Sequence, residues 1–153
     1  MENKLHEVLP TDPAITYQLE WVRCLRNTVR KFMTGNTNEI TMKQQIEWFS
    51  GLDHGKFKLY IYTSSGRMAG YGIVRVEGDK VLLTGAIDEK FRGIGLGKDL
   101  FRKLMLEAYD MPGKVSLEVN GSNVRAINLY KSIGFTQVNY DLDRDVIMME
   151  ISE

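Results

Sequence analysis

The 153-residue sequence predicts a mixed α/β (α+β) protein, in which a central, mostly antiparallel sheet of about seven strands carries about four helices. Three observations predict this class. Apolar residues recur at helical spacing in the first third of the chain, and they alternate at strand spacing in the middle. A glycine-rich segment then leads into a second set of helices and strands. The expected order is β-α-α-β-β-β-α-β-α-β-β, which implies a mixed sheet covered by helices.

The first elements are a short strand and a helix. Residues 4–9 are expected to form the strand, which Pro10 closes. Asp12-Pro13 is typical of a helix start, because Asp accepts from free N–H groups and Pro is tolerated in the first turn. The helix is expected to run to about Asn27. Within it, we expect Cys24 to be a small buried hydrophobe and not a reactive thiol.

A second helix is expected after a loop at residues 35–38, which are rich in Gly, Asn and Thr. The spacing of Thr41 and Gln44 matches a capping box, in which each residue binds the backbone of the other. The expected apolar stripe of this helix is Met42, Ile46 and Phe49.

The middle of the chain predicts an antiparallel meander. Strands are expected at residues 57–62, 68–76 and 81–88, joined by turns at 64–66 and 77–79. Glycines within strands are unusual, and they indicate bending or the close approach of another group to the backbone. These glycines are Gly70, Gly72 and Gly85.

The last part of the chain alternates helices and strands. We expect helices at residues 96–109 and 123–133, the second stopped at Gly134, and strands at 115–119, 135–140 and 146–151. The inner face of the first of these helices is expected to comprise Leu96, Leu100, Phe101, Leu104, Met105 and Ala108.

Composition excludes several classes of protein. The 20 basic and 20 acidic residues give zero net charge, which disfavours a broadly basic nucleic-acid binder. One cysteine permits no intramolecular disulfide, and His6 and His54 are too far apart in sequence for a typical zinc site, so we expect no metal. No apolar run reaches the ~20 residues of a membrane span, and residues 1–7 lack a signal-peptide pattern. The expectation is one cytoplasmic domain, residues 1–153, with no membrane partner.

The glycine loop at residues 92–97 indicates a phosphate site, because free N–H groups and the helix dipole both attract anions. It is neither a dinucleotide fingerprint, since Lys98 stands where a glycine is needed, nor a P-loop, since Asp99 replaces Ser or Thr. A tight strand-to-helix connection without a ligand is the alternative. Around the loop is a cluster of cations: Lys90, Arg92, Lys98, Arg102 and Lys103.

Two blocks of sequence resemble one family. Arg92-Gly93-Ile94-Gly95-Leu96-Gly97 is similar to the R/Q-x-x-G-x-G/A signature of the GNAT superfamily of acyl-CoA-dependent N-acyltransferases. The second block is similar to the L-E-V…N-x-x-A-x-x-L-Y-x-x-x-G-F pattern of that family, in the version seen in ribosomal-protein alanine acetyltransferases. It comprises Leu117, Glu118, Val119, Asn123, Ala126, Leu129, Tyr130, Gly134 and Phe135.

The resemblance implies acetyl-CoA as co-substrate, with no metal. By resemblance, the backbone of Ala86 and Ile87 should pair with the pantetheine arm, and Asn123 should contact the same arm. The amides that should wrap the pyrophosphate are those of Arg92, Gly93, Ile94, Gly95, Leu96, Gly97 and Lys98.

Acylation of an amine needs a base, an oxyanion donor and an acid. Glu118 is the candidate base, because it interrupts an apolar strand; the alternative is a glutamate on a solvated strand face. Tyr130 is the candidate acid, seven residues after Asn123 and so on nearly the same helix face; the alternative is a core aromatic. By resemblance, a backbone N–H near Ile87 or Asp88 would polarise the carbonyl.

The acceptor is less well specified. In the family the first two helices and the loop between them shape its pocket. This region resembles acetyltransferases that act on amino groups of nucleotide-linked sugars, and Arg26 and Arg30 would suit such a negatively charged substrate. The second block favours a protein N-terminus instead, and we interpret Trp48 and Phe49 as helix packing. The expectation is an N-acetyltransferase, monomer or homodimer, that acetylates a primary amine of a small molecule or peptide by direct attack in a ternary complex. A non-catalytic acyl-CoA-binding sensor of the same fold is the alternative.

Overall fold

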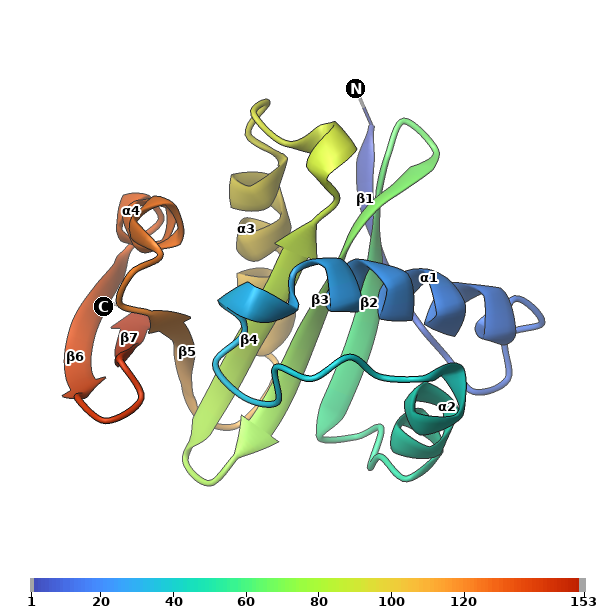
Figure 1. Cartoon of the computed structure of the whole chain (residues 1–153), viewed down its shortest axis with the longest axis horizontal. Coiled ribbons are helices and arrows are strands. Elements are labelled where there is room, and N and C mark those ends of the chain that lie inside the picture. The colour runs from blue at the N-terminus through green and yellow to red at the C-terminus, as the bar shows by residue number, and fades with distance from the viewer. Residues whose placement is uncertain (1, 152–153) are drawn as a thin grey trace.

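A computed structural model describes residues 2–151, which form one seven-stranded sheet with the order β1-β2-β3-β4-β5-β7-β6 (Figure 1). Every neighbouring pair is antiparallel except β4 and β5, which are parallel. The elements are β1 (Asn3–Glu7), α1 (Ile15–Thr28), η1 (Arg30–Phe32), α2 (Met42–Ser50), β2 (Phe57–Ser64), β3 (Arg67–Glu77), β4 (Lys80–Ile87), η2 (Glu89–Phe91), α3 (Leu96–Ala108), β5 (Lys114–Asn120), α4 (Val124–Ser132), β6 (Phe135–Asp141) and β7 (Val146–Ile151). The predicted order of strands and α-helices is confirmed, and the short helices η1 and η2 are additions to it.

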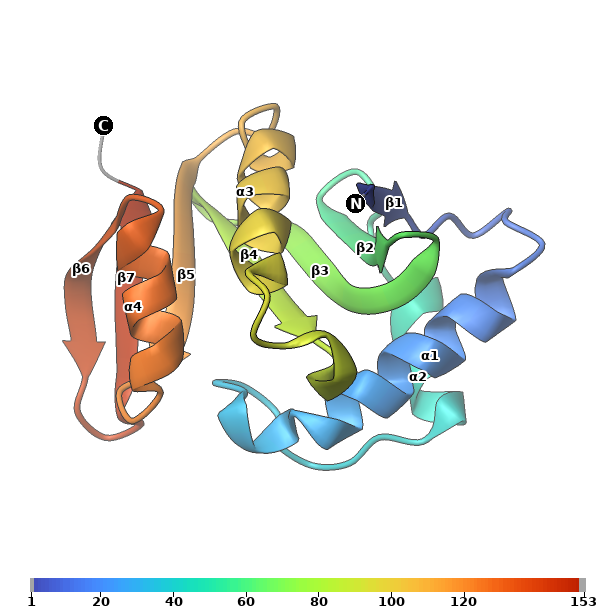
Figure 2. The same cartoon turned by 90° about the horizontal axis from the view of Figure 1, so that it is seen from above.

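The helices cover both faces of the sheet (Figure 2). On one face, α1 and α2 pack on β2 and β3, and Leu19, Phe49 and Tyr71 are buried together there. On the other face, α3 and α4 enclose a second core that contains Leu100 and Val74. Because side chains alternate along a strand, β3 supplies residues to both cores.

The strand glycines mark close approaches. A Cβ atom at Gly70 would lie 2.4 Å from the carbonyl oxygen of Ala86, and one at Gly72 would lie 2.6 Å from Leu104 Cδ2. Both distances are far inside van der Waals contact, so a side chain at Gly70 would displace the backbone of β4, and one at Gly72 would force the Leu104 side chain of α3 to move. This confirms the predicted close approach.

The ends of the first two helices follow from their capping. The backbone N–H of Ala14 donates to Asp12 Oδ1 at 2.8 Å, which makes a turn, and α1 begins only at Ile15. The capping box of α2 is confirmed: Gln44 N–H donates to Thr41 Oγ1 at 3.2 Å, and Thr41 N–H donates to Gln44 Oε1 at 2.8 Å.

Two burial predictions are wrong. Ile46 is 42% exposed, and Gln45 is buried instead, because Gln45 and Phe49 stand four residues apart on the inner face of α2. Gln45 satisfies its amide by donating to the carbonyl oxygen of Leu19. Cys24 is exposed, because it shares the outer face of α1 with Glu20, whose carboxylate accepts a 3.5 Å hydrogen bond from the thiol.

Candidate active site

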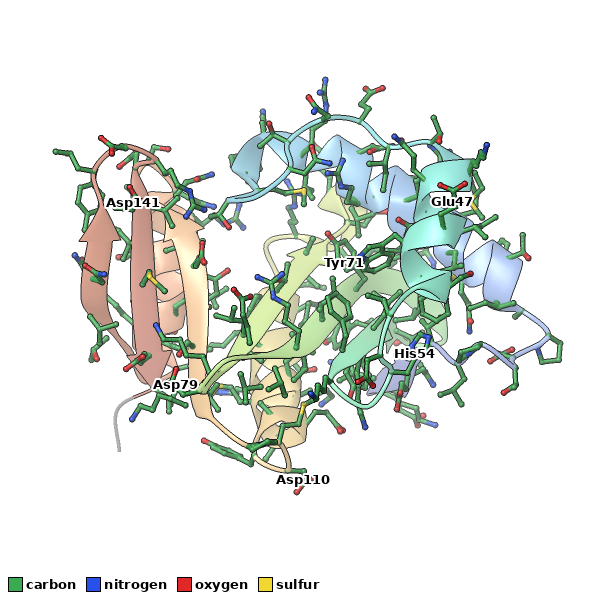
Figure 3. All side chains as sticks on the ribbon, turned by 90° about the horizontal axis from the view of Figure 1, so that it is seen from below. Glu47, His54, Tyr71, Asp79, Asp110 and Asp141 are labelled. Atoms are coloured by element: carbon green, nitrogen blue, oxygen red, sulfur yellow. The ribbon has the colours of Figure 1, made fainter. Side chains whose placement is uncertain are left out.

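The two central strands separate after a short parallel pairing. Their register covers Lys80↔Lys114, Val81↔Val115 and Leu82↔Ser116, and within the described chain β4 has no further partner on this edge. The remainder of β4, residues 83–87, therefore borders an opening between the two halves of the sheet (Figure 3). This opening holds a cavity of about 1230 Å³, whose lining includes residues of β4, β5, α1, α4, the α1–α2 loop and the glycine loop. That volume exceeds what one small ligand usually occupies.

Positive backbone angles shape the glycine loop. Gly93 and Gly95 have φ of 86° and 82°, in the left-handed region that favours glycine. A Cβ atom at either position would meet nothing within 4 Å, so conformation and not space accounts for these glycines.

The start of α3 differs from the start of α2. Among residues 2–151, no side chain caps the first turn of α3, whereas Thr41 caps α2. The early N–H groups of α3 are therefore available to an anion. Gly97, in this first turn, lies against α4: a Cβ atom there would be 3.2 Å from Leu129 Cδ1.

The cations near this loop divide into two groups. Arg92 and Lys98 line the cavity, and Arg92 Nε donates to the carbonyl oxygen of Ile87 at 3.1 Å. Lys103 instead pairs with Asp99 at 3.2 Å, while Lys90 and Arg102 are solvent-exposed.

A backbone N–H group at the end of β4 faces the opening. The N–H of Asp88 donates to the carbonyl oxygen of Ala69 at 2.8 Å. Neighbouring residues of an antiparallel strand direct their N–H groups to opposite sides, so the N–H of Ile87 points away from β3 and toward the opening. Ile87 and Ala86 both line the cavity.

Glu118 also lines the cavity, from β5. Its side chain is 22% exposed, and Oε2 lies 3.3 Å from Arg144 Nη2. The same Nη2 donates to the carbonyl oxygen of Thr34 at 2.8 Å. Arg144, in the β6–β7 turn, thus connects the carboxylate to the α1–α2 loop. Neither the pairing nor the residue was predicted, since 26 positions separate Arg144 from Glu118.

Tyr130 lies in α4 and is half-buried beside the cavity. Its ring packs edge-on against Phe101, at 4.9 Å between centroids, and against Phe135, at 6.2 Å. Burial raises the pKa of the Tyr130 phenol to about 12, so the hydroxyl keeps its proton at neutral pH. Asn123 lines the same cavity, and its Oδ1 caps α4 by accepting from the N–H of Ala126 at 3.2 Å.

The α1–α2 loop closes the other side of the cavity. Arg26, only 8% exposed, donates to the carbonyl oxygens of Asn36, at 2.6 Å, and of Asn38. Through these hydrogen bonds Arg26 holds the α1–α2 loop in place. Arg30 pairs with Glu39 at 3.7 Å and is absent from the described cavity lining.

Several lining residues on this side were not predicted as part of a site. Tyr71 and Arg75 come from β3, and Tyr71 lies beneath α1 (Figure 3). Trp48 lines the cavity while Phe49 is buried, so the packing interpretation holds fully for Phe49 alone. Strand alternation is the one signal that could have identified Tyr71 and Arg75, because both share the face that carries α1.

Two further features concern metals and membranes. Among residues 2–151, no group of three or more His, Cys, Asp and Glu side chains could hold a metal ion. No helix in that range is long and apolar enough to cross a bilayer.

Comparison with curated proteins gives matches to N-acetyltransferases. Over 78 residues the chain is 38% identical to the [ribosomal protein bS18]-alanine N-acetyltransferase of Salmonella typhimurium strain LT2, and 36% identical to that of Escherichia coli strain K12. These matches cover 49% of the chain, which spans about half (52%) of the length of these curated relatives.

Solved structures match over nearly the whole chain. Spermidine N-acetyltransferase from Vibrio cholerae, in complex with CoA and spermine, has a TM-score of 0.83 at 13% identity, with 97% of this chain and 94% of that chain covered. Ribosomal-protein-alanine N-acetyltransferase from Brucella melitensis has a TM-score of 0.77 at 17% identity, with 97% and 99% covered. At these identities the likeness is one of fold.

The family model described as "Acetyltransferase (GNAT) domain" matches residues 16–149, which is most of the chain and includes every residue that lines the cavity. The chain belongs to the GNAT acetyltransferase family.

Proposed function

We propose that the protein transfers the acetyl group of acetyl-CoA to a primary amine of a small molecule or peptide, by direct attack within a ternary complex. One observation carries the proposal: the unpaired edge of β4 runs into the uncapped start of α3, and both border one cavity with Glu118 and Tyr130. The amine-acetylating relatives named above support the same reaction.

The chain's backbone suits the proposed co-substrate. Free N–H groups at the start of α3 favour pyrophosphate oxygens, as helix N-termini generally do. Ala86 and Ile87, on the open edge of β4, suit an extended arm that hydrogen-bonds like an added strand. The side-chain carbonyl oxygen of Asn123 accepts the cap hydrogen bond of α4, so its amide NH₂ is the group that would donate to that arm.

Acetyl-CoA supplies a thioester, in which the amine forms a bond to the carbonyl carbon while the carbon–sulfur bond breaks. The N–H of Ile87 would donate to the carbonyl oxygen as negative charge develops on it. Glu118, directly or through water, would take the proton that the attacking nitrogen loses. Arg144 would hold the carboxylate in place for that step.

Tyr130 would act on the departing sulfur. With a pKa of about 12, its phenol is a weaker acid than an ordinary thiol, whose pKa is about 8.5. Complete proton transfer from Tyr130 to a thiolate is therefore uphill. The role we propose is a hydrogen-bond donor that stabilises the developing thiolate, with the final proton coming from solvent.

The test has two parts. Calorimetry with acetyl-CoA should show saturable binding at one site, and a screen of amines (amino acids, amino sugars, polyamines and peptide N-termini) should show acetyl-CoA consumption with at least one of them. Binding without turnover on any amine would identify the protein as a sensor. Absence of binding would refute the proposal entirely.

A further inference from the structure

Cations dominate the charged lining of the cavity. The charged residues that line it are Arg26, Arg75, Arg92, Lys98, Arg125, Arg144 and Glu118. Among the described residues, Glu118 is thus the one carboxylate against six cations. Because the whole chain has zero net charge, this excess is local to the cavity.

The cations lie on two sides of the sheet. Arg92, Lys98 and Arg125 come from the glycine loop and from α3 and α4, where the phosphates of the co-substrate would lie. The other three lie on the opposite side: Arg26 in α1, Arg75 in β3 and Arg144 in the β6–β7 turn. Phosphates held at the start of α3 leave this second group unexplained.

Two of the three arginines on the α1 side are committed to the protein itself. Arg26 donates to carbonyl oxygens of the α1–α2 loop. Arg144 binds Glu118, at 3.3 Å, and the carbonyl oxygen of Thr34.

Arg75 is held less firmly. Its Nε is buried without a hydrogen-bond partner among the described residues, which is uncommon for a buried donor and leaves its desolvation uncompensated. Its Nη2 pairs with Glu77 at 3.3 Å, but the Glu77 side chain is 66% exposed, and such pairs contribute little. An incoming anion could therefore replace Glu77 at small cost.

Apolar residues flank Arg75 on the neighbouring strands. Its Cα is in register with Phe57 on β2 and with Leu82 on β4, and the ring of Trp48 meets that of Phe57 edge-on at 5.4 Å. All four of these residues line the cavity. A charge pair in such surroundings is stronger than one in open water.

Arg75 also lies within reach of the proposed base. Leu82 is in register with Arg75 and with Ser116, and Glu118 follows Ser116 by two residues on the same face of β5. Two strand spacings across the sheet and two residues along it place the Cα atoms of Arg75 and Glu118 at least ~12 Å apart, because β4 and β5 diverge beyond Ser116. Both side chains point to the face that carries α1, so one small molecule can contact both.

We propose that the acceptor amine carries an anionic group, a carboxylate or a phosphate, which Arg75 binds on the α1 side of the cavity. This inference rests on the proposed function and specifies its substrate class. A polyamine would instead meet three arginines and a single carboxylate, itself already paired with Arg144.

The test uses pairs of amines that differ in one anionic group. Amino acids and dipeptides are compared with their carboxamides, and amino-sugar phosphates with the unphosphorylated sugars; spermidine represents polycations. We expect kcat/KM to be at least about 10-fold higher for the anionic member of one series, which also identifies the anion as carboxylate or phosphate. Arg75→Gln should lower kcat/KM for the anionic member by about 10- to 100-fold and change that for its neutral partner by less than about twofold.

The control is Lys58→Gln. Lys58 lies beside Phe57 on β2, with a side-chain exposure of 34% against 38% for Arg75, but does not line the cavity. Lys58→Gln removes the same charge from the same sheet and should leave kcat/KM unchanged for both the anionic and the neutral member of each pair. Arg75→Lys should retain part of the preference for the anion.

Binding measurements separate this inference from the proposed function. Calorimetry on the CoA-loaded protein reports binding of each amine, and acetyl-CoA affinity reports the integrity of each variant. Anionic amines that bind through Arg75 but are never acetylated would support the anion site and refute the acetyltransferase. Three results would overturn the anion site. The first is that neutral amines or spermidine are acetylated with the same kcat/KM as the anionic amines. The second is that Arg75→Gln lowers kcat/KM equally for the anionic and the neutral member of a pair, and the third is that no anionic amine binds.

Discussion

The two sides of the cavity are built in different ways. The co-substrate side consists mainly of backbone from one continuous segment, the end of β4, the glycine loop and the start of α3. The acceptor side consists of side chains that come from α1, β3, β5 and the β6–β7 turn. A site built from backbone can be predicted from local sequence, because the glycines that its positive φ angles require stand close together in the chain. A site built from side chains of distant segments can be predicted only when the strand register is known. Variants that separate the two sides test this division.

The largest expected effect is on the acceptor side, at Glu118. Glu118→Gln should lower kcat by about 10²- to 10⁴-fold, the usual contribution of a general base, with unchanged affinity for acetyl-CoA. Steady-state kinetics measures the loss of kcat, and calorimetry measures the affinity for acetyl-CoA.

Glu150→Gln is the matched control. Glu150 is in register with Ser116 on the same face, has the same side-chain exposure of 22%, and also pairs with a cation, Lys80, at 3.8 Å. It does not line the cavity, so kcat should be unaffected. Equal losses in both variants would assign Glu118 a structural role.

The second effect is at Tyr130, where Tyr130→Phe should lower kcat by about 10- to 100-fold while acetyl-CoA still binds, because one hydrogen bond to a developing charge is lost. Burial raises the pKa of this phenol from 10 to about 12, so wild type and variant should share the same alkaline behaviour up to about pH 10. Full activity of Tyr130→Phe would exclude the donor role. Tyr140→Phe, at an exposed tyrosine on β6, is the control.

The same pKa makes a prediction for stability. The folded state favours neutral Tyr130, so its contribution to the free energy of unfolding is complete below pH 10 and is lost as the pH rises to about 12. Denaturant unfolding of wild type and Tyr130→Phe between pH 8 and 12 should show a smaller alkaline loss in the variant. Identical alkaline losses would contradict the raised pKa.

The third effect tests the co-substrate side at Gly95. Gly95→Ala forces a Cβ into left-handed backbone, at a cost of about 1–2 kcal/mol, and shifting the loop should weaken acetyl-CoA binding by about 5- to 30-fold. Gly66, in the β2–β3 turn, has a similar φ of 78° and the same free space, but lies outside the cavity lining. Gly66→Ala should cost comparable stability without any loss of acetyl-CoA affinity. Equal affinities in the two variants would contradict a phosphate role for the loop.

Most of the fold was predictable because its signals are local. The capping box at Thr41, the strand glycines and the alternation in the meander each indicate structure within a few residues. The errors arose where helix faces had to be chosen. Ile46 and Cys24 are apolar residues on outer faces, and only the packing of α1 and α2 against the sheet shows which face is inward.

The part of the candidate site that lies in short sequence blocks was also predictable from local signals. One cavity is lined by Glu118, Asn123, Tyr130 and every residue of the glycine loop except Ile94, as sequence blocks with fixed spacing indicate. Arg75 and Arg144 could not be predicted, because their place in the cavity depends on the β3–β4 register and on how the β6–β7 turn meets the α1–α2 loop.

The smallest effect compares two helix caps. Asn123→Ala and Thr41→Ala each remove one cap hydrogen bond of 3.2 Å, so each should cost about 1 kcal/mol of stability. Only Asn123 lines the cavity, and its free amide group is the proposed donor to the pantetheine arm. Acetyl-CoA affinity should therefore fall about threefold in Asn123→Ala and remain unchanged in Thr41→Ala, since a neutral hydrogen bond contributes about 0.5–1.5 kcal/mol. Equal affinities at equal stability would reduce Asn123 to a cap, and binding at the arm would then depend on the β4 backbone alone.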